Sequence, residues 1–488
     1  MSYLDLTLKE IHQALVDKKV TPSELLEEAL KRAKENKDNA FEYICEKEAR
    51  EFVKTLGPVE EDNILFGIPF LAKDNFSTEG IETTASSDIL KGYVPVFNAT
   101  VIQKLKDKKA VMIGKTCLDE LAMGGTGTSG HLGKTYNPYD PTHQRMIGGS
   151  SSGSASLTAS GVVPFALGSD TGDSVRKPAS FGGLVGFKPT WGRISRYGLF
   201  PFACSLDHVG YFTRSVEDSA VLLNVLAGRD VNDSTSSTRE VEDYTSFLKK
   251  NHPYKLAVLK EVISGITDPF LKEKFLKSEE ELKKRGYVVE YVNFGEELLK
   301  SLYPTYIVIS SAEATSNDAN LDGIKFGPYH QGKTYQEVMF KARTEGFSTL
   351  IKRRFVLGSY CLMAENQEEL FLRAQRNRTL IVRRINEILK DYDFIYVPAA
   401  PSIAPKFDES SDYFSTEYLV NDNLLVLGNF SGLPSITVPL AMEKGFPLGV
   451  NLMGRAFEEK ALFEASEVVE EITGLKGLSY LNKKEGNL

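Results

Sequence analysis

Hydrophobic positions along the chain follow two spacings, one typical of amphipathic helices and one typical of buried strands. Residues 4–36 carry apolar side chains at helical spacing and predict two helices. The second helix opens at Thr21-Pro22-Ser23-Glu24. Thr21 can cap this helix, Pro22 suits its first turn, and Glu24 completes a capping box. The N-terminal segment is therefore expected to form a pair of packed helices.

Short apolar runs bounded by polar residues predict a series of buried strands. The apolar run Ile64–Ala72 ends at Lys73, and we take Pro69 as an edge or strand-start position and the residues after it as a buried strand. Further strands are predicted at 110–113, 162–167, 255–259, 287–292 and 394–398. Helices are predicted after Thr100, at 215–228, at 272–285 and at about 366–390. Strands that alternate with helices indicate an α/β fold with helices on both faces of a sheet.

Residues 124–161 are rich in Gly, Ser and Thr, yet they are too apolar at their edges for a flexible linker. We interpret them as a structured binding loop that leads into a helix of small residues at 154–160. The next buried run is followed by a glycine-containing turn from Gly168 to Ser174. We expect one domain over residues 1–478, with no internal boundary, and a polar tail over residues 479–488.

Composition narrows the class of protein. The 488 residues are 42% hydrophobic and 25% charged, with a formal net charge of −8. These values are typical of a globular protein. The sequence has no basic excess or basic stripe of the kind expected in a chain that binds nucleic acid by itself. The first residues lack the pattern of a signal peptide, and no apolar run is long enough for a membrane helix. A cytoplasmic protein that does not enter a membrane is expected.

Cysteine and histidine patterns give no support for a metal site. The four cysteines, Cys45, Cys117, Cys204 and Cys361, are far apart, and none of the six histidines forms a closely spaced pair. Two other patterns also fail on context. The match to G-x-S-x-G at 149–153 lacks a preceding strand, and the single Asp170-Thr171-Gly172 has no second copy to supply a paired carboxylate.

Three ordered motifs carry a stronger signal. They are Gly148-Gly149-Ser150-Ser151-Ser152-Gly153-Ser154-Ala155, Leu167-Gly168-Ser169-Asp170-Thr171-Gly172-Asp173-Ser174-Val175-Arg176 and Gly186-Phe187-Lys188-Pro189-Thr190. Upstream of them, the segment from Gly67 through Lys73 to Asn75 ends an apolar run in lysine. Together these segments resemble the amidase signature family, over about residues 5–475. The resemblance implies the amidase signature fold, a single large domain built on a mixed sheet.

The resemblance implies a catalytic set of Lys73, Ser150 and Ser174, with a cis peptide bond between Gly149 and Ser150. The chemistry is consistent with this. A serine hydroxyl is a poor nucleophile near pH 7 and needs a base. Burial disfavours a charged lysine and lowers its pKa, so Lys73 at the end of an apolar strand can accept a proton. Lys73 would take a proton through Ser150, which relays it from the nucleophile Ser174.

The turn from Thr171 to Ser174 is expected to aim backbone N–H groups at the oxyanion of the reaction, from Thr171, Gly172, Asp173 and Ser174. Ser151, Asp170 and Arg176 are expected to hold this turn. Many members of the family have glycine where this chain has Asp173. Either the Asp173 side chain turns outward and leaves its N–H in place, or the activity is impaired or altered.

Further segments resemble one branch of the family, the A subunits of glutamyl-tRNA(Gln) amidotransferases. They are 192–199, 205–207, 213–218, 314–317, 322–327 and 352–354. The resemblance implies a subunit that releases ammonia from glutamine. A partner B subunit, which is expected to hold ATP and Mg²⁺, uses the ammonia to convert Glu-tRNA(Gln) to Gln-tRNA(Gln), and a small C subunit joins the two. No cofactor is expected in this chain, and tRNA contact would fall mainly to the partner.

The family's glutamine-recognition positions fall on Tyr306, Arg354 and Asp422, and Gly124, Gly125 and Thr126 are expected to line the same pocket. A guanidinium can hold the α-carboxylate of glutamine, and a carboxylate can hold its α-ammonium. Two other functions stay open. One is a stand-alone amidase for another small or fatty amide. The other is a non-catalytic scaffold subunit, which only Asp173 supports and which the retained Lys73 and serines argue against.

Overall fold

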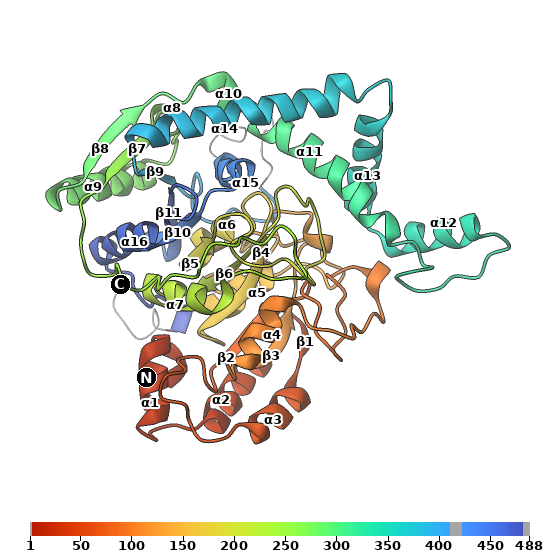
Figure 1. Cartoon of the computed structure of the whole chain (residues 1–488), viewed down its shortest axis with the longest axis horizontal. Helices are drawn as coiled ribbons and strands as arrows, with labels where there is room; N and C mark the ends of the chain where they lie inside the picture. Colours follow the sequence, from red (N-terminus) through yellow and green to blue (C-terminus); the bar gives the residue numbers. More distant parts are fainter. Residues whose placement is uncertain (1, 410–421, 482–488) are drawn as a thin grey trace.

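Every strand of the described chain joins one central sheet. The computed structural model describes residues 2–409 and 422–481 (Figure 1). Within them an eleven-stranded sheet has the order β1-β3-β2-β4-β6-β5-β10-β11-β9-β7-β8. The strands are β1 Phe41–Ile44, β2 Pro69–Lys73, β3 Val111–Thr116, β4 Phe165–Asp170, β5 Val185–Lys188, β6 His208–Thr213, β7 Lys255–Leu259, β8 Val288–Val292, β9 Phe394–Pro398, β10 Ser435–Glu443 and β11 Phe446–Met453.

The sheet is mixed. Strand β2 runs parallel to both of its neighbours, β3 and β4, and β7 runs parallel to β8 and β9. The strands between β4 and β9 pair antiparallel. Because β2 and β4 are parallel neighbours, their carboxyl ends reach the same edge of the sheet. Strand β2 ends there at Lys73 and β4 ends at Asp170.

Helices cover both faces of the sheet. Tyr211 and Phe212 are adjacent in β6 and belong to two different buried apolar clusters, because neighbouring side chains of a strand point to opposite faces. Around strands β1 to β6 lie α1 Leu8–Val16, α2 Pro22–Glu35, α3 Glu46–Thr55, α4 Thr100–Asp107, α5 Ser152–Ala159, α6 Arg176–Gly182 and α7 Val216–Leu226. Further along the sheet, α16 Glu459–Thr473 packs on β10 and β11, and α9 Pro269–Lys284 packs on β8 and β10.

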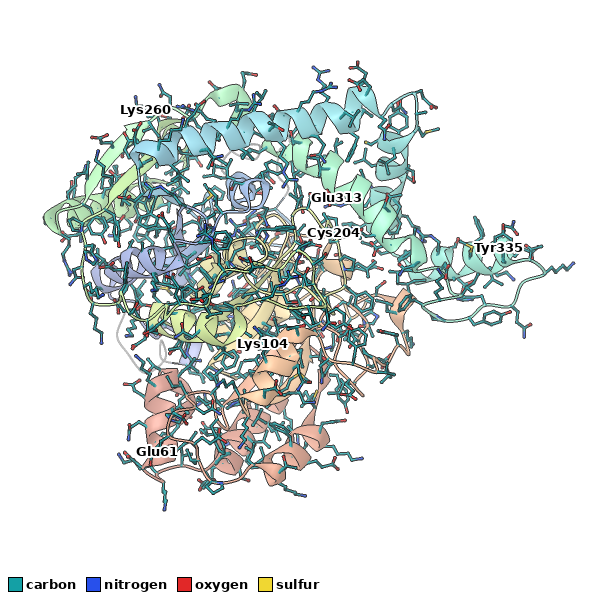
Figure 2. All side chains as sticks on the ribbon, in the orientation of Figure 1. Glu61, Lys104, Cys204, Lys260, Glu313 and Tyr335 are labelled. Atoms are coloured by element: carbon teal, nitrogen blue, oxygen red, sulfur yellow. The ribbon has the colours of Figure 1, made fainter. Side chains whose placement is uncertain are left out.

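A second helical layer lies over the other end of the sheet (Figure 1). It contains α8 Lys260–Ser264, α10 Glu296–Lys300, α11 Leu302–Asn317, α12 Tyr335–Gly346, α13 Thr349–Leu362, α14 Arg373–Asp391 and α15 Leu427–Ser431. Helix α12 projects from the rest of the molecule, and Figure 2 shows Tyr335 at its start, where the residue is 64% exposed.

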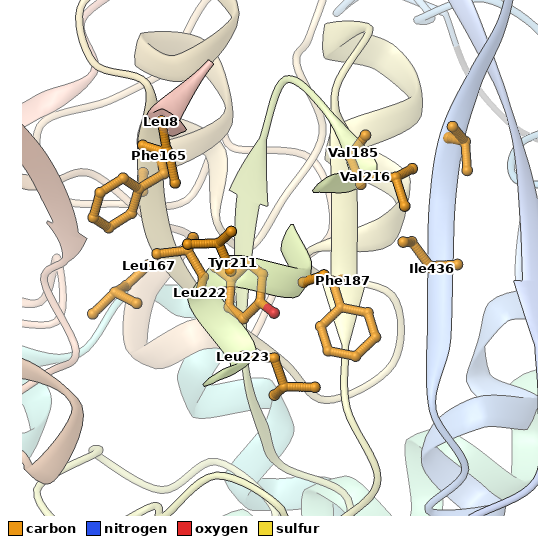
Figure 3. Close-up of a cluster of buried hydrophobic side chains, with 14 of the residues drawn as sticks. Leu8, Phe165, Leu167, Val185, Phe187, Tyr211, Val216, Leu222, Leu223 and Ile436 are labelled. Atoms are coloured by element: carbon orange, nitrogen blue, oxygen red, sulfur yellow. The ribbon is translucent and has the colours of Figure 1, made fainter. Parts of the chain in front are cut away.

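The largest apolar cluster fixes the strands that lead to the sheet edge. Phe165 and Leu167 of β4, Phe187 of β5 and Tyr211 of β6 are buried together beneath α7 (Figure 3). Burying a large apolar side chain contributes about 1.5–3 kcal/mol relative to leaving it exposed. The backbone at the ends of β2 and β4 is therefore held by a large core.

The predicted architecture is confirmed, and several boundaries are corrected. The capping box of Thr21 and Glu24 is present, and Pro69 begins β2. The strand predicted at 162–167 instead runs from Phe165 to Asp170, after Pro164, which has no N–H to donate to a ladder. The helix predicted at 154–160 is α5, Ser152–Ala159, and a π-helical turn, Glu368–Leu372, precedes α14. Within the described residues, no helix combines the length and apolar composition needed to cross a membrane.

The predicted C-terminal tail falls only partly within the described residues. Ser479, its first residue, is buried, and the ring of Tyr480 packs edge-on against that of Tyr139 at a centroid distance of 5.9 Å. Residues 482–488 lie outside the described part of the chain. The boundary between domain and tail stays a prediction.

Candidate active site

Lys73 lies at the carboxyl end of β2 and is surrounded by hydroxyl groups. Its Nζ atom lies 2.7 Å from Oγ of Ser150, 3.0 Å from Oγ of Ser151 and 2.9 Å from Oγ of Ser169. The lysine has no exposed surface. No carboxylate forms an ion pair with it within the described residues, so nothing at contact distance compensates a charge on the buried amine.

Burial controls the protonation of Lys73. Desolvation lowers the pKa of Lys73 to about 7, against the more distant negative charges of Asp119, Asp170 and Asp207. A buried amine loses hydration that an apolar site cannot replace, so the neutral form is favoured. Near pH 7 a large fraction of Lys73 is therefore unprotonated and able to accept a proton.

The segment around Ser150 is held by a loop organised on Asp119. The peptide bond between Gly149 and Ser150 is cis, as the resemblance implies. The buried carboxylate of Asp119 accepts hydrogen bonds from four successive backbone N–H groups, those of residues 126–129. A Cβ atom at Gly149 would lie 2.0 Å from Oδ2 of Asp119, so only glycine fits at this position.

The predicted substrate-lining residues Gly124, Gly125 and Thr126 belong to this same loop. The N–H of Gly149 donates to the carbonyl of Gly125 at 2.9 Å, and Gly125 and Thr126 are exposed. The loop therefore lies directly beside the peptide that carries Ser150, with part of its surface open to solvent.

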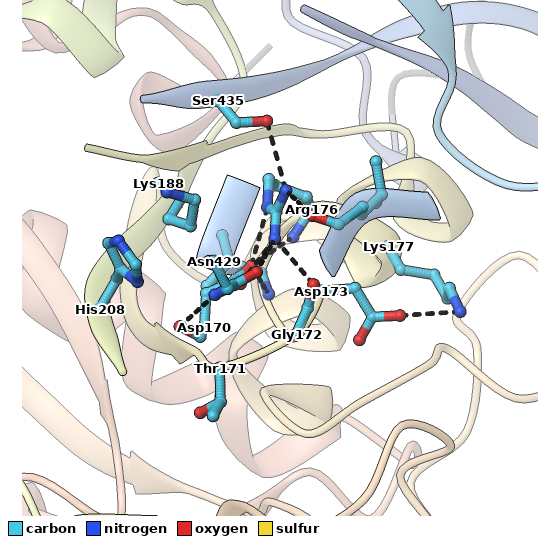
Figure 4. A network of polar contacts seen from close by, with 12 residues as sticks. Asp170, Thr171, Gly172, Asp173, Arg176, Lys177, Lys188, His208, Asn429 and Ser435 are labelled. Carbon is cyan, nitrogen blue, oxygen red and sulfur yellow. Dashed lines mark hydrogen bonds and ion pairs between the residues drawn. The ribbon is translucent and has the colours of Figure 1, made fainter. Parts of the chain in front are cut away.

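A buried ion pair fixes the turn that carries Ser174. The carboxylate of Asp170 accepts hydrogen bonds from Nη2 of Arg176 at 2.8 Å and from Nε at 3.1 Å (Figure 4). Burial opposes ionisation of Asp170, but the charge of Arg176 and hydrogen bonds from Arg176 and Asn429 hold the pKa of Asp170 well below its usual range. Arg176 also donates to the carbonyl of Gly172 at 2.9 Å, which pins the middle of the turn.

Backbone donors are available in this turn. The N–H groups of Gly172, Asp173 and Ser174 donate no hydrogen bond within the described residues, although Ser174 is only 3% exposed. The side chain of Thr171, at the start of the turn, is fixed by its hydroxyl, which donates to Oδ1 of Asp207 at 2.7 Å. Unpaired N–H groups at one buried turn can bind an oxyanion.

The two serine segments meet through the backbone. The N–H of Ser151 donates to the carbonyl oxygen of Ser174 at 3.3 Å. The hydroxyl of Ser174 makes no hydrogen bond within the described residues, so the contact from Ser150 to Ser174 is not formed in this conformation. Such contacts tighten when substrate binds. The structure thus brings Lys73, Ser150 and Ser174 together, with the link between Lys73 and Ser150 already made.

The side chain of Asp173 is turned toward a cation. Its Oδ2 atom lies 2.8 Å from Nζ of Lys177, one helical turn further along the chain (Figure 4). The same Nζ atom donates to the carbonyl oxygen of Asp422 at 2.5 Å and to its Oδ1 atom at 3.3 Å. The side chain of Asp173 is therefore paired with Lys177, and whether it turns away from the oxyanion as predicted from the sequence stays a prediction.

Two of the predicted recognition residues lie together above the turn. A Cβ atom at Gly172 would lie 3.2 Å from the ring of Tyr306, so this ring covers the turn. The guanidinium of Arg354 lies over the ring of Phe202 at 5.6 Å and donates one long hydrogen bond, 3.4 Å, to Ser310. It forms no ion pair within the described residues, and its remaining donors are available to a carboxylate.

One cavity of about 330 Å³ opens beside the site without containing it. Its lining includes Asp207, which bonds to Thr171, together with Arg196 and Cys204. None of Lys73, Ser150 and Ser174 lines it. The chemical centre, at Lys73 and the two serines, therefore lies outside this cavity. Within the described residues, no group of three or more His, Cys, Asp or Glu side chains is arranged to hold a metal ion.

Four residues of the site were not predicted from the sequence. Ser169 lies inside a quoted motif, one position before Asp170, where its neighbours could have indicated it. Lys177 follows Asp173 by four positions, a spacing that predicts an ion pair once a helix is known to begin there. Asp119 and Asn429 carry no sequence signal, because they reach the site only through the fold.

Comparisons with known proteins agree with this geometry. A family model described as Amidase matches residues 24–463. The chain is 40% identical over 479 residues to the A subunit of glutamyl-tRNA(Gln) amidotransferase from Latilactobacillus sakei subsp. sakei (strain 23K), covering 97% of both chains. It is also 40% identical to the protein of the same name from Persephonella marina (strain DSM 14350 / EX-H1), covering 97% of this chain and 98% of that one.

Solved structures give the same result. The crystal structure of the glutamyl-tRNA(Gln) amidotransferase A subunit from Thermotoga maritima superposes with a TM-score of 0.78 at 34% identity, covering 96% of this chain and 95% of that one. A structure described as an amidase superposes with a TM-score of 0.79 at 28% identity, covering 96% of this chain and all of that one. With a matched family model, relatives of this identity and a shared fold, the chain belongs to the amidase family.

Proposed function

We propose that this chain is the glutamine-hydrolysing subunit of a tRNA-dependent amidotransferase. It would release ammonia from glutamine, and a partner B subunit with bound ATP and Mg²⁺ would use that ammonia to convert Glu-tRNA(Gln) to Gln-tRNA(Gln). A small C subunit would join the two. The relatives, which are named as A subunits of glutamyl-tRNA(Gln) amidotransferase, support this assignment. The net charge of −8 is consistent with tRNA contact mainly through the partner, and we place the complex in the cytoplasm.

The buried Lys73 beside Ser150 carries the proposal. In the first step, the neutral amine of Lys73 takes the hydroxyl proton of Ser150, and Ser150 takes that of Ser174 as Oγ of Ser174 attacks the amide carbon. The carbonyl oxygen becomes an oxyanion, which the free N–H groups of Gly172 to Ser174 would stabilise. Losing one such donor typically costs about 3–4 kcal/mol of barrier.

In the second half of the reaction, the tetrahedral intermediate collapses and the amide C–N bond breaks. The proton returns through Ser150 to the leaving nitrogen, which departs as ammonia and leaves an ester on Ser174. Water then attacks the ester with the same base and releases glutamate. Arg354 and Asp422 would hold the α-carboxylate and α-ammonium of glutamine during both steps.

The experiment is to purify the chain with and without its partner subunits and to measure glutamate and ammonia from glutamine, and Gln-tRNA(Gln) from Glu-tRNA(Gln). We expect both activities in the complex and neither in a Ser174→Ala complex. Hydrolysis of simple amides but not of glutamine, with or without partners, would indicate a stand-alone amidase. A complex that makes Gln-tRNA(Gln) from glutamine equally well after Ser174→Ala would make the chain a scaffold, but Asp173, which supported that reading, is turned toward Lys177.

A further inference from the structure

We propose that Lys177 is a positioning residue that holds Asp422 beside the nucleophile, and that Asp173 keeps the resulting cluster negatively charged so that it attracts the ammonium group of the substrate. The proposal rests on the glutamine-hydrolysing function above. The three residues are called the Asp173–Lys177–Asp422 cluster.

Every donor of Lys177 has an acceptor within the cluster. An ammonium group has three donors. Those of Lys177 match Oδ2 of Asp173 at 2.8 Å, the carbonyl oxygen of Asp422 at 2.5 Å and Oδ1 of Asp422 at 3.3 Å. Because these partners occupy all three donors, Lys177 is not available to bind an anionic substrate itself. Its contacts join two segments that lie 245 residues apart in the sequence.

The position of Lys177 makes this link relevant to the nucleophile. Lys177 is the second residue of α6, which begins two residues after Ser174. The N–H of Lys177 donates to the carbonyl of Asp173 at 2.9 Å, so the start of the helix is hydrogen-bonded directly to the turn. Within the described residues, Lys177 is the one partner that Asp422 has. Lys177 thus sets where Asp422 lies relative to Ser174.

The charge of the cluster favours a cation. Lys177 is charged, because the two carboxylates raise its pKa well above the usual range despite its burial. Burial raises the pKa of Asp173, against the charge and the hydrogen bond of Lys177, and with both carboxylates ionised the cluster carries one excess negative charge. Oδ2 of Asp422 accepts no hydrogen bond within the described residues, and the side chain is 32% exposed, so the open acceptor of the cluster lies there.

Asp173 explains why this excess exists. Without the Asp173 carboxylate, Lys177 would neutralise Asp422, and the pair would carry no net charge. A neutral pair attracts an ammonium ion far less than a negative cluster does. The departure from glycine at position 173 is therefore matched by a lysine one turn later, and together they set the charge that Asp422 presents.

The first measurement is ligand binding without turnover. The full chain with Ser174→Ala is titrated calorimetrically with glutamine and with glutaramate, which lacks the α-amine. Lys177→Met removes the contacts that position Asp422, and losing the aligned contact between Asp422 and the ammonium group should outweigh the added negative charge. Glutamine binding should therefore weaken about 10-fold or more, and glutaramate binding should stay within about 2-fold. Lys177→Arg should restore most of the glutamine affinity, and Lys284→Met, at an exposed surface lysine, serves as the matched control.

The second measurement is turnover with Ser174 intact. Lys177→Met should raise KM for glutamine and change kcat by less than about 3-fold, and Asp173→Asn should also raise KM for glutamine. The effect should disappear with glutaramate. Equal losses for glutamine and glutaramate, or no change in either, would overturn the proposal, because Lys177 would then only support the fold or have no role.

Failure of the proposed function gives a different result. A wild-type complex that cleaves simple amides but neither binds nor cleaves glutamine refutes the glutaminase assignment. In that case 4-aminobutanamide and butanamide, which differ only in the amine, replace the first pair of ligands. A selective loss of 4-aminobutanamide in Lys177→Met would still support an ammonium-attracting cluster, and equal losses of both amides would refute it.

Discussion

The Nζ atom of Lys73 lies 2.7 Å from the hydroxyl oxygen of Ser150, in a position with no exposure to solvent. The lysine comes from the last residue of a central strand, and the serine follows a cis peptide bond. This pairing replaces the histidine of many serine hydrolases with an amine whose basicity is set by burial.

The pH dependence of turnover should follow Lys73. Because burial lowers its pKa to about 7, the amine is protonated below pH 7 and neutral above it. We expect kcat/KM for glutamine to fall about 10-fold for each pH unit below about 6 and to level off above about 8. A profile that stays flat from pH 5.5 to 8.5 would contradict a titrating base at this position.

Replacing Lys73 with arginine tests whether the reaction needs a base at this position or only a positive charge. Lys73→Arg keeps a cation but cannot give up its proton at usable pH, so turnover should fall about 10²- to 10⁴-fold. The variant should be compared with wild type by circular dichroism to check that it folds. Near-normal turnover in a folded Lys73→Arg enzyme would remove Lys73 from the mechanism.

Ser174 should form the covalent intermediate. A glutamine analogue with a diazomethyl ketone in place of the amide should alkylate Oγ of Ser174, because Lys73 and Ser150 activate this hydroxyl. The hydroxyl proton passes to the diazo carbon, N₂ leaves, and a stable ether remains on Ser174. Peptide mapping by mass spectrometry should find the adduct on the peptide that contains Ser174, and excess glutamine should suppress it. Labelling of Ser151 or Cys204 with Ser174 unmodified is the result that this mechanism does not allow.

Arg354 should select glutamine among amides. Arg354→Ala removes a guanidinium that forms no ion pair within the described residues, and losing one charge-assisted contact costs about 1.5–3 kcal/mol, or about 10- to 150-fold in kcat/KM. Hydrolysis of 4-aminobutanamide, which has no carboxylate, should change little. Arg353→Ala, at the exposed neighbouring position of α13, is the control. Equal losses for both substrates would make Arg354 a residue of the fold.

Glu470 should destabilise the protein as the pH rises. Burial raises the pKa of Glu470 to about 8, against a hydrogen bond from the N–H of Val216. Between about pH 4.5 and 8 the folded state therefore keeps a proton that the unfolded state has lost, so stability falls as pH rises through this window. Glu470→Gln keeps an acceptor oxygen and does not titrate.

Urea denaturation measures this effect. Glu470→Gln should raise the free energy of unfolding at pH 8.5 by about 1–3 kcal/mol and should change it by less than about 1 kcal/mol at pH 4.5. Glu471→Gln, at the exposed neighbouring position of α16, should stay within about 0.5 kcal/mol at both pH values. A benefit of Glu470→Gln that is equal at pH 4.5 and 8.5 would show that ionisation is not its cause.

The sequence predicted features that nearby residues decide. Thr21 and Glu24 form the capping box from adjacent positions, and the run before Lys73 is a buried strand. The antiparallel strands β10 and β11 were missed, because they gain their stability from pairing with each other and with distant strands. Propensity within one segment does not carry that information.

The same difference between features set by nearby residues and features set by distant ones applies to the site. Lys73, Ser150 and Ser174 were located by motifs that lie in order along the chain. The supports Asp170 and Arg176 were located in the same way, whereas Asn429 was not, because it bonds to Asp170 from 259 residues away. One local signal was also missed. The helix predicted at 272–285 begins at Pro269, and Asp268-Pro269 is a recognisable helix start. The catalytic residues could thus be predicted from motifs, whereas the residues that tertiary packing brings against them could not.

The residues that break the bond and two of the expected recognition residues come from separate stretches of the chain. Lys73, Ser150 and Ser174 lie between β2 and α6, whereas Tyr306 and Arg354 are on α11 and α13 of the helical layer. Bond breaking and the contacts that Tyr306 and Arg354 make with the amide can therefore change independently of each other. Drift in the helical layer can give a descendant enzyme a new substrate while the residues that break the bond remain unchanged.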